Sequence, residues 1–451
     1  MLIDKIGYSY NDVTIIPNEI STISSRSECN PFIENTKNWL PIFASPMASV
    51  VNKNNMDVFY ENGITPILPR NIDFEIRKEE MNNQSWVALS LKEFEELFIN
   101  NAKDRIGDFR THYFVVIDIA NGHMKSLYAD CIVAKQNADN FGYKLTIMTG
   151  NIANPKTYEW ICKNIRYINK DGEKKSAVDF IRVGIGGGSG CITTSNVSIH
   201  YPQATLINEC YNVKLNLLAE YTDISAYSKM PKYNKNDFPK IVADGGIRNY
   251  DHVIKALALG ADYVMIGSVF AQCIESAGEK LIKSSKVSLE VPIHRFKNFR
   301  IDTKGNVHGY YIDEFIEENS KPWKTELDNA KAKVNLGVWL PSNAEYKLAV
   351  LQYNEKIKNL KEEKFIGQIE VKFFGMASAD GQKSIDGEKK KTAEGITKYL
   401  PVKYTLKGWV ENMISYLRSA MSYTNCKTLQ EFIGSPLLIV NSISEIHAVN
   451  K

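Results

Sequence analysis

The chain has 451 residues, a net charge of +3 and 44% hydrophobic residues. So small a net charge argues against a dedicated nucleic-acid surface, and the apolar and charged contents are ordinary for a globular protein. The length allows two or three average domains, or one large α/β barrel with additions.

The N-terminal residues contain no apolar segment of a secretory signal, and no run of about eighteen apolar residues predicts a membrane span. Seven cysteines are scattered along the chain without a Cys-x-x-Cys pair. An odd number at such spacing predicts reduced thiols rather than a disulfide framework or a zinc site. We therefore expect a cytoplasmic protein that binds neither membranes nor nucleic acid.

Short apolar segments that end in polar or glycine residues recur along the first part of the chain. They are residues 40–44, 64–68, 86–89, 113–117, 145–148, 180–183, 240–243 and 262–266. Stretches with helical spacing, such as 91–100 and 252–259, lie between them. Apolar strands that alternate with helices predict a parallel sheet covered on its outer face. Eight repeats favour an α/β fold of the (β/α)8 TIM-barrel type, with an open doubly wound sheet as the alternative.

In such a barrel, functional residues lie where the strands end and the following loops begin. Polar and glycine residues gather at these positions, among them Ser45, Asp118, Asn121, Gly122, Asp244, Gly246, Gly267 and Ser268. Glycine after strands 7 and 8 exposes backbone N–H groups that can bind a phosphate, and Ser189 and Ser268 add hydroxyls. Three glycine-bearing loops at one rim favour a phosphorylated ligand over simple tight turns.

A glycine-rich loop from Gly184 to Thr194 follows the sixth apolar segment and contains Cys191. A strand does not continue through so much glycine, because glycine adds no packing and frees the backbone. Such a loop lets backbone N–H groups approach a ligand and holds one thiol in its middle. A lone cysteine is more often buried and inert than nucleophilic, so these residues alone leave both roles open.

The alternation of strands and helices stops near residue 280. Residues 296–301 and 308–312 predict a hairpin. A helix follows, and one of its faces consists of Val350, Tyr353, Ile357 and Leu360. We interpret this stretch as a large insertion in the loop after strand 8.

The expected organisation is therefore a barrel over residues 1–280, an inserted subdomain over residues 281–368 and a C-terminal part over residues 369–451. Within the C-terminal part, residues 377–391 lack periodicity and predict a mobile flap. Helical spacing resumes over residues 409–421, which predicts the eighth barrel helix.

Taken in this order, the sequence resembles the IMP dehydrogenase/GMP reductase family over about residues 8–279 and 370–432. The matching motifs are Tyr10-Asn11-Asp12-Val13, Ser45-Pro46-Met47, Gly186-x-Gly188-Ser189-x-Cys191-Ile192-Thr193, Tyr201-Pro202-Gln203, Ala243-Asp244-Gly245-Gly246, Ile266-Gly267-Ser268, Glu275-Ser276-x-Gly278-Glu279, Phe374-Gly375-Met376-Ala377-Ser378 and Ala393-Glu394-Gly395. Each motif is a modest match, but their order is specific. The resemblance implies a barrel enzyme in which the Cys191 thiolate attacks C2 of a purine nucleotide.

The resemblance also implies roles for individual residues. The catalytic residues would be Cys191, Thr193 and Glu394, with Glu394 acting through Thr193 as the general acid. The residues that bind the nucleoside monophosphate would be Ser45, Ser189, Asp244, Gly246, Gly267, Ser268, Met376, Ala377 and Ser378. The nicotinamide of NADPH would approach Asp118, Asn121 and Gly122. A monovalent cation such as K⁺ would bind the backbone carbonyls of Gly186, Gly188 and Cys191, and the family barrels imply a homotetramer.

Several features distinguish the two activities of this family. Family dehydrogenases carry regulatory modules between strands 2 and 3, and residues 69–85 leave no room for them. The sequence from Asp118 to His123 and the carboxylate of Glu394 resemble the reductase. Dehydrogenases also carry an Arg-Tyr pair on the flap that activates water, and residues 377–398 contain no arginine. The Ser-Pro-Met and Cys-Ile-Thr motifs resemble the dehydrogenase instead.

We therefore expect a GMP reductase that uses NADPH to convert GMP to IMP and ammonia. Two alternatives stay open, namely an IMP dehydrogenase that forms XMP from IMP, NAD and water, and a non-catalytic barrel that binds purine nucleotides. The substrate also stays open between GMP, a guanine deoxynucleotide and another purine.

Overall fold

The computed structural model describes residues 6–105, 111–188, 190–227, 238–282, 295–335, 341–387, 392–393 and 395–441. The chain forms two compact units. The first comprises Met1–Glu279, Lys372–Tyr399 and Leu406–Lys451, and the second comprises Lys280–Val371 and Leu400–Thr405. Within the described residues, no helix is long and apolar enough to cross a lipid bilayer.

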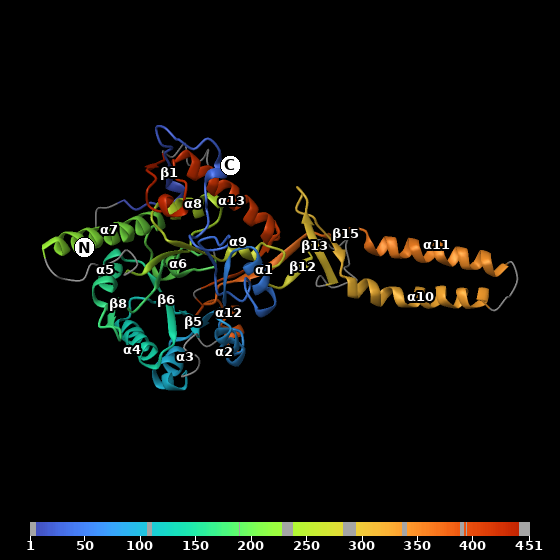
Figure 1. Cartoon of the computed structure of the whole chain (residues 1–451), viewed down its shortest axis with the longest axis horizontal. Helices are drawn as coiled ribbons and strands as arrows, with labels where there is room; N and C mark the ends of the chain where they lie inside the picture. The colour runs from blue at the N-terminus through green and yellow to red at the C-terminus, as the bar shows by residue number, and fades with distance from the viewer. Residues whose placement is uncertain are drawn as a thin grey trace. The chain divides into compact units, whose positions relative to one another are not determined.

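The first unit is built on a closed barrel of eight strands, all parallel to their neighbours (Figure 1). In barrel order the strands are β2 (Ile42–Ala44), β3 (Thr65–Leu68), β4 (Trp86–Leu89), β5 (His112–Ile117), β6 (Lys144–Ile152), β9 (Phe180–Val183), β10 (Lys240–Asp244) and β11 (Tyr263–Ile266). Each of the eight predicted apolar segments becomes one of these strands. The TIM-barrel prediction is confirmed, and the open sheet is excluded because β11 pairs with β2.

One helix follows each strand and covers the outside of the barrel (Figure 1). These helices are α1 (Met56–Glu61), α2 (Phe74–Asn82), α3 (Leu91–Glu95), α4 (Lys125–Phe141), α5 (Pro155–Asn164), α7 (Gln203–Tyr227), α8 (Tyr250–Ala258) and α13 (Leu406–Tyr423). The last of them confirms the helix predicted over residues 409–421. Its Trp409 stacks on Tyr250 of α8 at 5.2 Å between ring centroids. Through this contact, α13 packs on the barrel after the inserted segment.

Shorter elements complete the first unit. They are β1 (Val13–Ile15), which pairs with β18 (Leu438–Val440), the hairpin of β7 (Arg166–Ile168) and β8 (Lys174–Ser176), and the short helices α6 (Thr193–Val197), α9 (Ser268–Ala271) and α14 (Leu429–Phe432). Both α6 and α9 start directly after barrel loops that carry predicted site residues.

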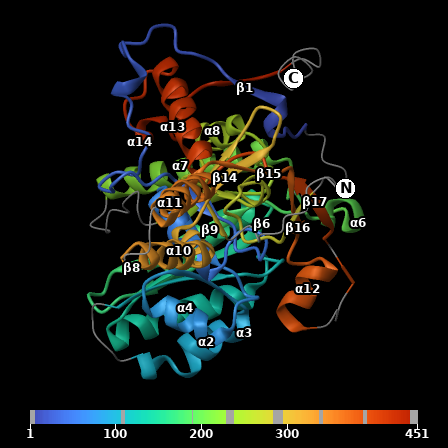
Figure 2. The ribbon, with the colours of Figure 1, turned by 90° about the vertical axis from the view of Figure 1, so that its right-hand side faces the viewer.

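The second unit contains an antiparallel sheet and a helical hairpin. The sheet has the order β13 (Phe296–Ile301), β14 (Val307–Tyr311) and β15 (Lys364–Gly367), which confirms the predicted β-hairpin. The helices α10 (Asp313–Asn335) and α11 (Pro341–Lys361) lie side by side (Figure 2). The sequence reasoning found α11 but not α10, since Pro322 within it is usually a helix-breaking signal. Strand β12 (Lys280–Ile282) pairs antiparallel with the start of β16 (Ile369–Phe374).

The segment predicted as a flap without periodicity contains a helix, α12 (Ala379–Asp386). Ser378 caps it by accepting a hydrogen bond from the backbone N–H of Gly381 at 3.0 Å. The helix ends at Gly387, whose φ is +75°. The helix is short, and its ends are defined by capping residues. A periodic pattern of apolar residues therefore could not predict it from the sequence. Residues 388–391 of the predicted flap lie outside the described part of the chain.

Candidate active site

Cys191 differs from the other cysteines in its exposure. It is half-buried, whereas the other six are buried. Burial raises the pKa of Cys162 to about 12 and also raises the pKa values of Cys131 and Cys210, which keeps these thiols protonated. Cys191 is therefore the candidate nucleophile of this chain.

Thr193 is the immediate partner of this thiol. Sγ of Cys191 donates a hydrogen bond to the Thr193 hydroxyl oxygen at 3.1 Å. The backbone N–H of Thr193 lies on the same sulfur, with a distance of 3.5 Å from nitrogen to Sγ. The hydroxyl of Thr193 is therefore within reach of a proton that moves to or from a group reacting at the sulfur. The pairing of Cys191 and Thr193 is thus suited to nucleophilic attack.

The cysteine loop contacts the loop after strand 7 through backbone atoms. The N–H of Gly246 donates to the carbonyl of Gly187 at 2.9 Å. Gly184 has φ of +134°, and a Cβ there would lie 2.2 Å from the carbonyl oxygen of Asp244. Only glycine permits this approach. The thiol loop and the predicted phosphate loop thus form one continuous surface.

The loops after strands 8 and 1 meet in the same way. The N–H of Ser45 donates to the carbonyl of Ile266 at 2.9 Å, and a Cβ on Gly267 would lie 2.9 Å from Sδ of Met47. Ser268 begins α9 directly after Gly267. The structure therefore places Ser45, Gly267 and Ser268 at one part of the rim.

Two buried polar side chains, Tyr10 and Gln203, lie next to the strand 7 loop. They interact with each other, and burial raises the pKa of Tyr10. The Tyr10 ring is 3.4 Å from where a Cβ on Gly246 would be, and Gln203 Oε1 is 2.6 Å from that of Gly184. Both side chains therefore pack directly against the glycine loops.

A buried ionic network lies at the carboxyl ends of strands 4, 6 and 7. Arg182 on β9 donates from Nε to Oδ2 of Asp244 at 2.9 Å and from Nη1 to Oδ1 of Asp118 at 3.0 Å. Arg70 donates to the other oxygen of Asp118 at 3.2 Å, and Asn151 donates to Oδ2 of Asp244 at 2.7 Å. The sequence analysis assigned roles to both aspartates but not to Arg182, Arg70 or Asn151. The signal that could have identified Arg182 is that it is a charged residue inside the apolar strand Phe180–Val183.

The charges in this network determine its protonation. Burial alone would raise the pKa of Asp118, but the guanidinium groups of Arg182 and Arg70 outweigh burial and lower it. Burial likewise opposes the charge of Arg182, and the carboxylates of Asp244 and Asp118 raise its pKa. Asp118 is therefore an ionised carboxylate with both oxygens occupied by arginines.

The predicted cofactor residues do not all join this network. The N–H of Gly122 donates to the carbonyl of Asn151 at 2.9 Å, and a Cβ on Gly122 would lie 2.6 Å from that oxygen. Gly122 is thus held beside the residue that binds Asp244. Asn121 is exposed, and its side-chain oxygen accepts the N–H of His123 at 3.0 Å within its own loop.

The flap segments flank the thiol. The N–H of Ile396 donates to the carbonyl of Gly190 at 3.0 Å, and Cys191 forms a β-bridge with Gly395. A Cβ on Gly375 would lie 2.7 Å from the Gly190 oxygen. Met376, Ala377 and Ser378 continue from this contact, with the Ser378 hydroxyl engaged as the cap of α12.

The carbonyls predicted to bind a cation are partly engaged. Gly186 accepts the hydroxyl of Thr194 at 3.1 Å, and Gly188 accepts the N–H of Cys191 at 3.0 Å. Each carbonyl oxygen has a second lone pair, so these bonds leave room for a cation. The described residues contain no group of three or more His, Cys, Asp or Glu side chains that could hold a metal ion. Ser189 and Glu394 lie outside the described part of the chain.

The structure places the protein among (β/α)8-barrel proteins that carry a candidate nucleophile in a loop after a barrel strand. The chain belongs to the IMP dehydrogenase/GMP reductase family, whose domain model matches residues 7–290.

Its similar proteins include bacterial enzymes named GMP reductase. That of Helicobacter pylori strain G27 is 28% identical over 313 residues, which cover 68% of this chain and 83% of the relative. Those of Streptococcus suis strain 05ZYH33 and Staphylococcus saprophyticus are each 26% identical, over 300 and 294 residues. The matches cover 65% and 63% of this chain, and 76% of each relative.

Proposed function

We propose that the protein is a GMP reductase that converts GMP to IMP and ammonia with NADPH. The observation that carries this proposal is the geometry of Cys191. It is half-buried while the other six cysteines are buried, and its sulfur lies 3.1 Å from the Thr193 hydroxyl. The similar proteins named GMP reductase support the same reaction.

The rim offers groups for each part of a purine nucleotide. Backbone N–H groups and hydroxyls at Gly267, Ser268 and Ser189 would hold the phosphate, while the N–H of Gly246 is donated to the carbonyl of Gly187. Both hydrogen bonds to the Asp244 carboxylate within the described residues go to Oδ2, so Oδ1 would accept the ribose hydroxyls. Backbone groups of Met376, Ala377 and Ser378 would contact the base beside the thiol.

The reaction would begin with attack of the Cys191 thiolate on C2 of the purine, which forms a carbon–sulfur bond. The exocyclic amine leaves as ammonia and takes a proton that the Thr193 hydroxyl delivers, with Glu394 as the source. NADPH, when bound, supplies the hydride that breaks the carbon–sulfur bond and releases IMP. Cys191 leaves as thiolate and is ready for the next turnover.

The Asp118 network offers a place for the cofactor on the same rim. The side chain of Arg70 is 25% exposed although it pairs with Asp118, so its guanidinium remains accessible to an anionic group. The exposed side chain of Asn121 lies in the loop that follows Asp118, whereas Gly122 is buried and both of its backbone groups are hydrogen-bonded. These residues fit a planar, negatively charged dinucleotide better than a second nucleophile or a water-activating base.

The alternative of an IMP dehydrogenase requires a base that activates water. Counting back from Glu394, the arginine and tyrosine of family dehydrogenases would fall at Gln382 and Lys383, which lie in α12. No arginine occurs between residues 377 and 398. We therefore favour resolution of the covalent adduct by hydride.

The deciding experiment mixes the purified protein with GMP and NADPH and follows loss of the reduced cofactor together with IMP and ammonia. The same protein is mixed with IMP and NAD, and XMP is measured. We expect turnover in the first mixture and negligible XMP in the second. Stoichiometric formation of XMP would show that the protein is an IMP dehydrogenase and not a reductase. Inactivity in both mixtures would favour the non-catalytic barrel. A parallel assay with dGMP identifies the preferred sugar.

A further inference from the structure

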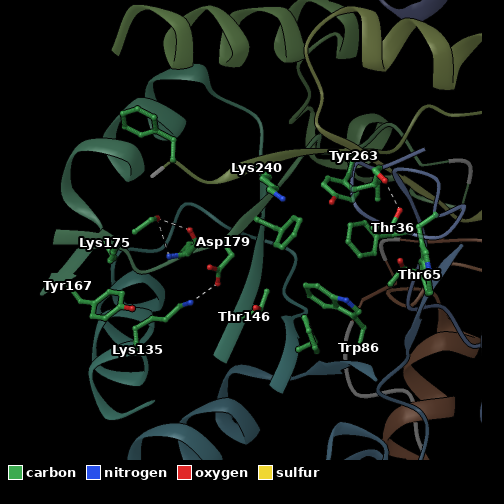
Figure 3. A pocket seen from close by; sticks show the side chains of 18 of the residues that line it. Thr36, Thr65, Trp86, Lys135, Thr146, Tyr167, Lys175, Asp179, Lys240 and Tyr263 are labelled. Atoms are coloured by element: carbon green, nitrogen blue, oxygen red, sulfur yellow. Dashed lines mark hydrogen bonds and ion pairs between the residues drawn. The ribbon is translucent and has the colours of Figure 1, made fainter. Parts of the chain in front are cut away.

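A cavity of about 600 Å³ lies at the end of the barrel opposite to Cys191 (Figure 3). Its lining includes Thr65, Trp86, Phe180, Lys240 and Tyr263, which are the first residues of β3, β4, β9, β10 and β11. Parallel strands begin at one end of a barrel and finish at the other. The cavity is therefore separate from the rim that carries the thiol and the glycine loops.

Aromatic rings form the floor of this cavity. Phe43 and Phe180 both contact Trp86, at 5.3 and 5.5 Å between ring centroids. Phe43 and Phe180 also contact Tyr263, at 5.2 and 5.4 Å. These four rings form one cluster in which Phe43, Trp86 and Phe180 are buried and Tyr263 is half-buried, so Tyr263 is the ring that a planar apolar group can reach.

Lys240 brings a positive charge over this floor. Its Nζ lies 5.4 Å from the ring centroids of both Phe180 and Tyr263. Figure 3 shows its side chain between Asp179 on one side and Tyr263 on the other. No hydrogen bond or ion pair of this ammonium is formed with any residue in the described ranges. Burial lowers the pKa of Lys240, and the charge of Lys214 acts in the same direction against Asp262 and Asp179.

The other lysines that line the cavity are paired. Lys135 binds Asp179 at 2.7 Å, and Lys175 binds Glu173 at 3.0 Å. The lining carries the cations Lys135, Lys175 and Lys240 and the anions Asp139 and Asp179. Each of these two ion pairs is neutral, so Lys240 is the lining lysine that is left to pair with a negatively charged ligand group.

We propose that this cavity binds an aromatic monocarboxylate. The ring of the ligand packs on Tyr263 at the edge of this aromatic cluster, and its carboxylate pairs with Lys240. The volume lies within the roughly 300–1,000 Å³ typical of small-molecule sites. Burial of the ligand ring adds hydrophobic free energy, and the ion pair supplies the partner that Lys240 lacks. This site is independent of the proposed reductase reaction.

The test uses the full-length protein and 2-naphthoate as the probe, titrated by calorimetry. We expect one saturable site. The neutral analogue 2-naphthamide should bind at least about tenfold more weakly, because it cannot form the charge-assisted bond. Lys240→Met should weaken 2-naphthoate binding by a similar factor. Lys175→Met removes a lining lysine that is already paired and should change the affinity little.

Further measurements separate this cavity from the active site and from misfolding. Saturating GMP should not displace the probe. Circular dichroism checks that Lys240→Met is folded, and Lys240→Gln, which keeps a polar side chain, should show the same loss if the methionine variant unfolds. Equal binding of 2-naphthoate and 2-naphthamide would overturn the proposal. So would unchanged binding in a folded Lys240 variant, displacement by GMP, or absence of any saturable site.

Discussion

Nε of Arg182 lies 2.9 Å from Oδ2 of Asp244, at the carboxyl end of neighbouring strands of the barrel. The same guanidinium reaches Asp118 from its Nη1 atom. A single buried arginine thus positions the carboxylate proposed for the ribose and the carboxylate proposed for the cofactor side. The two parts of the proposed active site thus share one cation, and we expect a change in Arg182 to affect both.

Replacement of Arg182 tests this arrangement. Arg182→Leu leaves the buried Asp118 and Asp244 without their shared counter-ion, and we expect a loss of about 3–5 kcal/mol in the free energy of unfolding. Arg182→Lys should lie between the wild type and Arg182→Leu, since one ammonium cannot bridge both carboxylates as a planar guanidinium does. Urea unfolding measures both variants. The control Lys407→Ala removes an exposed ion pair to Glu411 and should change stability little. Equal stability of wild type and Arg182→Leu would contradict a central role for the network.

Cys191 should be essential for turnover but not for nucleotide binding. Cys191→Ala removes the nucleophile and should abolish GMP reduction, while calorimetry still detects GMP. Cys191→Ser should be almost as inactive, because a hydroxyl is hardly ionised at neutral pH. Mass spectrometry after brief treatment with iodoacetamide should find Cys191 alkylated first, since the other six thiols are buried. Full activity of the alanine variant would remove the covalent mechanism.

The close approach of the flap to the cysteine loop should be needed for activity. A Cβ on Gly375 would lie 2.7 Å from the carbonyl oxygen of Gly190, so Gly375→Ala must push the two segments apart. We expect kcat/KM for GMP to fall by about tenfold to a hundredfold while the melting temperature changes little. Gly172→Asn is a matched control, because its φ of +79° suits asparagine and nothing lies within 4 Å of a Cβ. Wild-type kcat/KM in Gly375→Ala would show that the contact is dispensable.

His252 should make stability depend on pH. Its Nε2 lies 2.8 Å from Oδ1 of Asn11, and its Nδ1 lies 2.9 Å from the carbonyl of Gly246. Burial lowers its pKa below 6.5, and the charges of Lys255 and Arg248 act in the same direction against Asp251. The unfolded chain therefore binds the proton more tightly than the folded one. The stability that neutral His252 contributes is complete above about pH 6.5 and is lost as the pH falls through the folded pKa.

The measurement is the free energy of unfolding between about pH 7.5 and pH 5. The slope should be smaller in His252→Gln, which cannot take up a proton there. His112 and His123 also have pKa values lowered by burial, so part of the slope should remain. Identical slopes for wild type and variant would exclude His252 as a contributor.

The helical hairpin of the second unit should be removable. Strands β14 and β15 pair with Gly309 opposite Lys364, so the two ends of the hairpin lie on neighbouring strands. Replacing residues 313–361 by a short Asn-Gly turn should preserve the sheet and leave a folded protein with GMP reductase activity. Circular dichroism, gel filtration and turnover check this outcome. An insoluble product would show that the hairpin is needed for folding.

Local sequence was sufficient for the barrel strands and for the motifs at their ends. A segment such as Phe180–Val183 is apolar because both of its faces are buried, and that burial is written into consecutive residues. The apolar face of helix α11 could also be predicted from consecutive residues. Its side chains are all half-buried, and they are Val350, Tyr353, Ile357 and Leu360. Glycines at Gly184 and Gly246 marked sharp turns, since their positive φ values exclude most other residues.

Only the tertiary structure decided which of these residues act together. Arg182 is a single charged residue in an apolar strand. Its role arises because β5 and β10 bring Asp118 and Asp244 to the same guanidinium. The helix α10 forms despite Pro322 because α11 packs along it, and no local pattern encodes that partner. Lys240 lies over Phe180 and Tyr263 because strands distant in sequence begin side by side. Contacts between distant segments depend on closure of the barrel, so they cannot be read from any stretch of sequence alone.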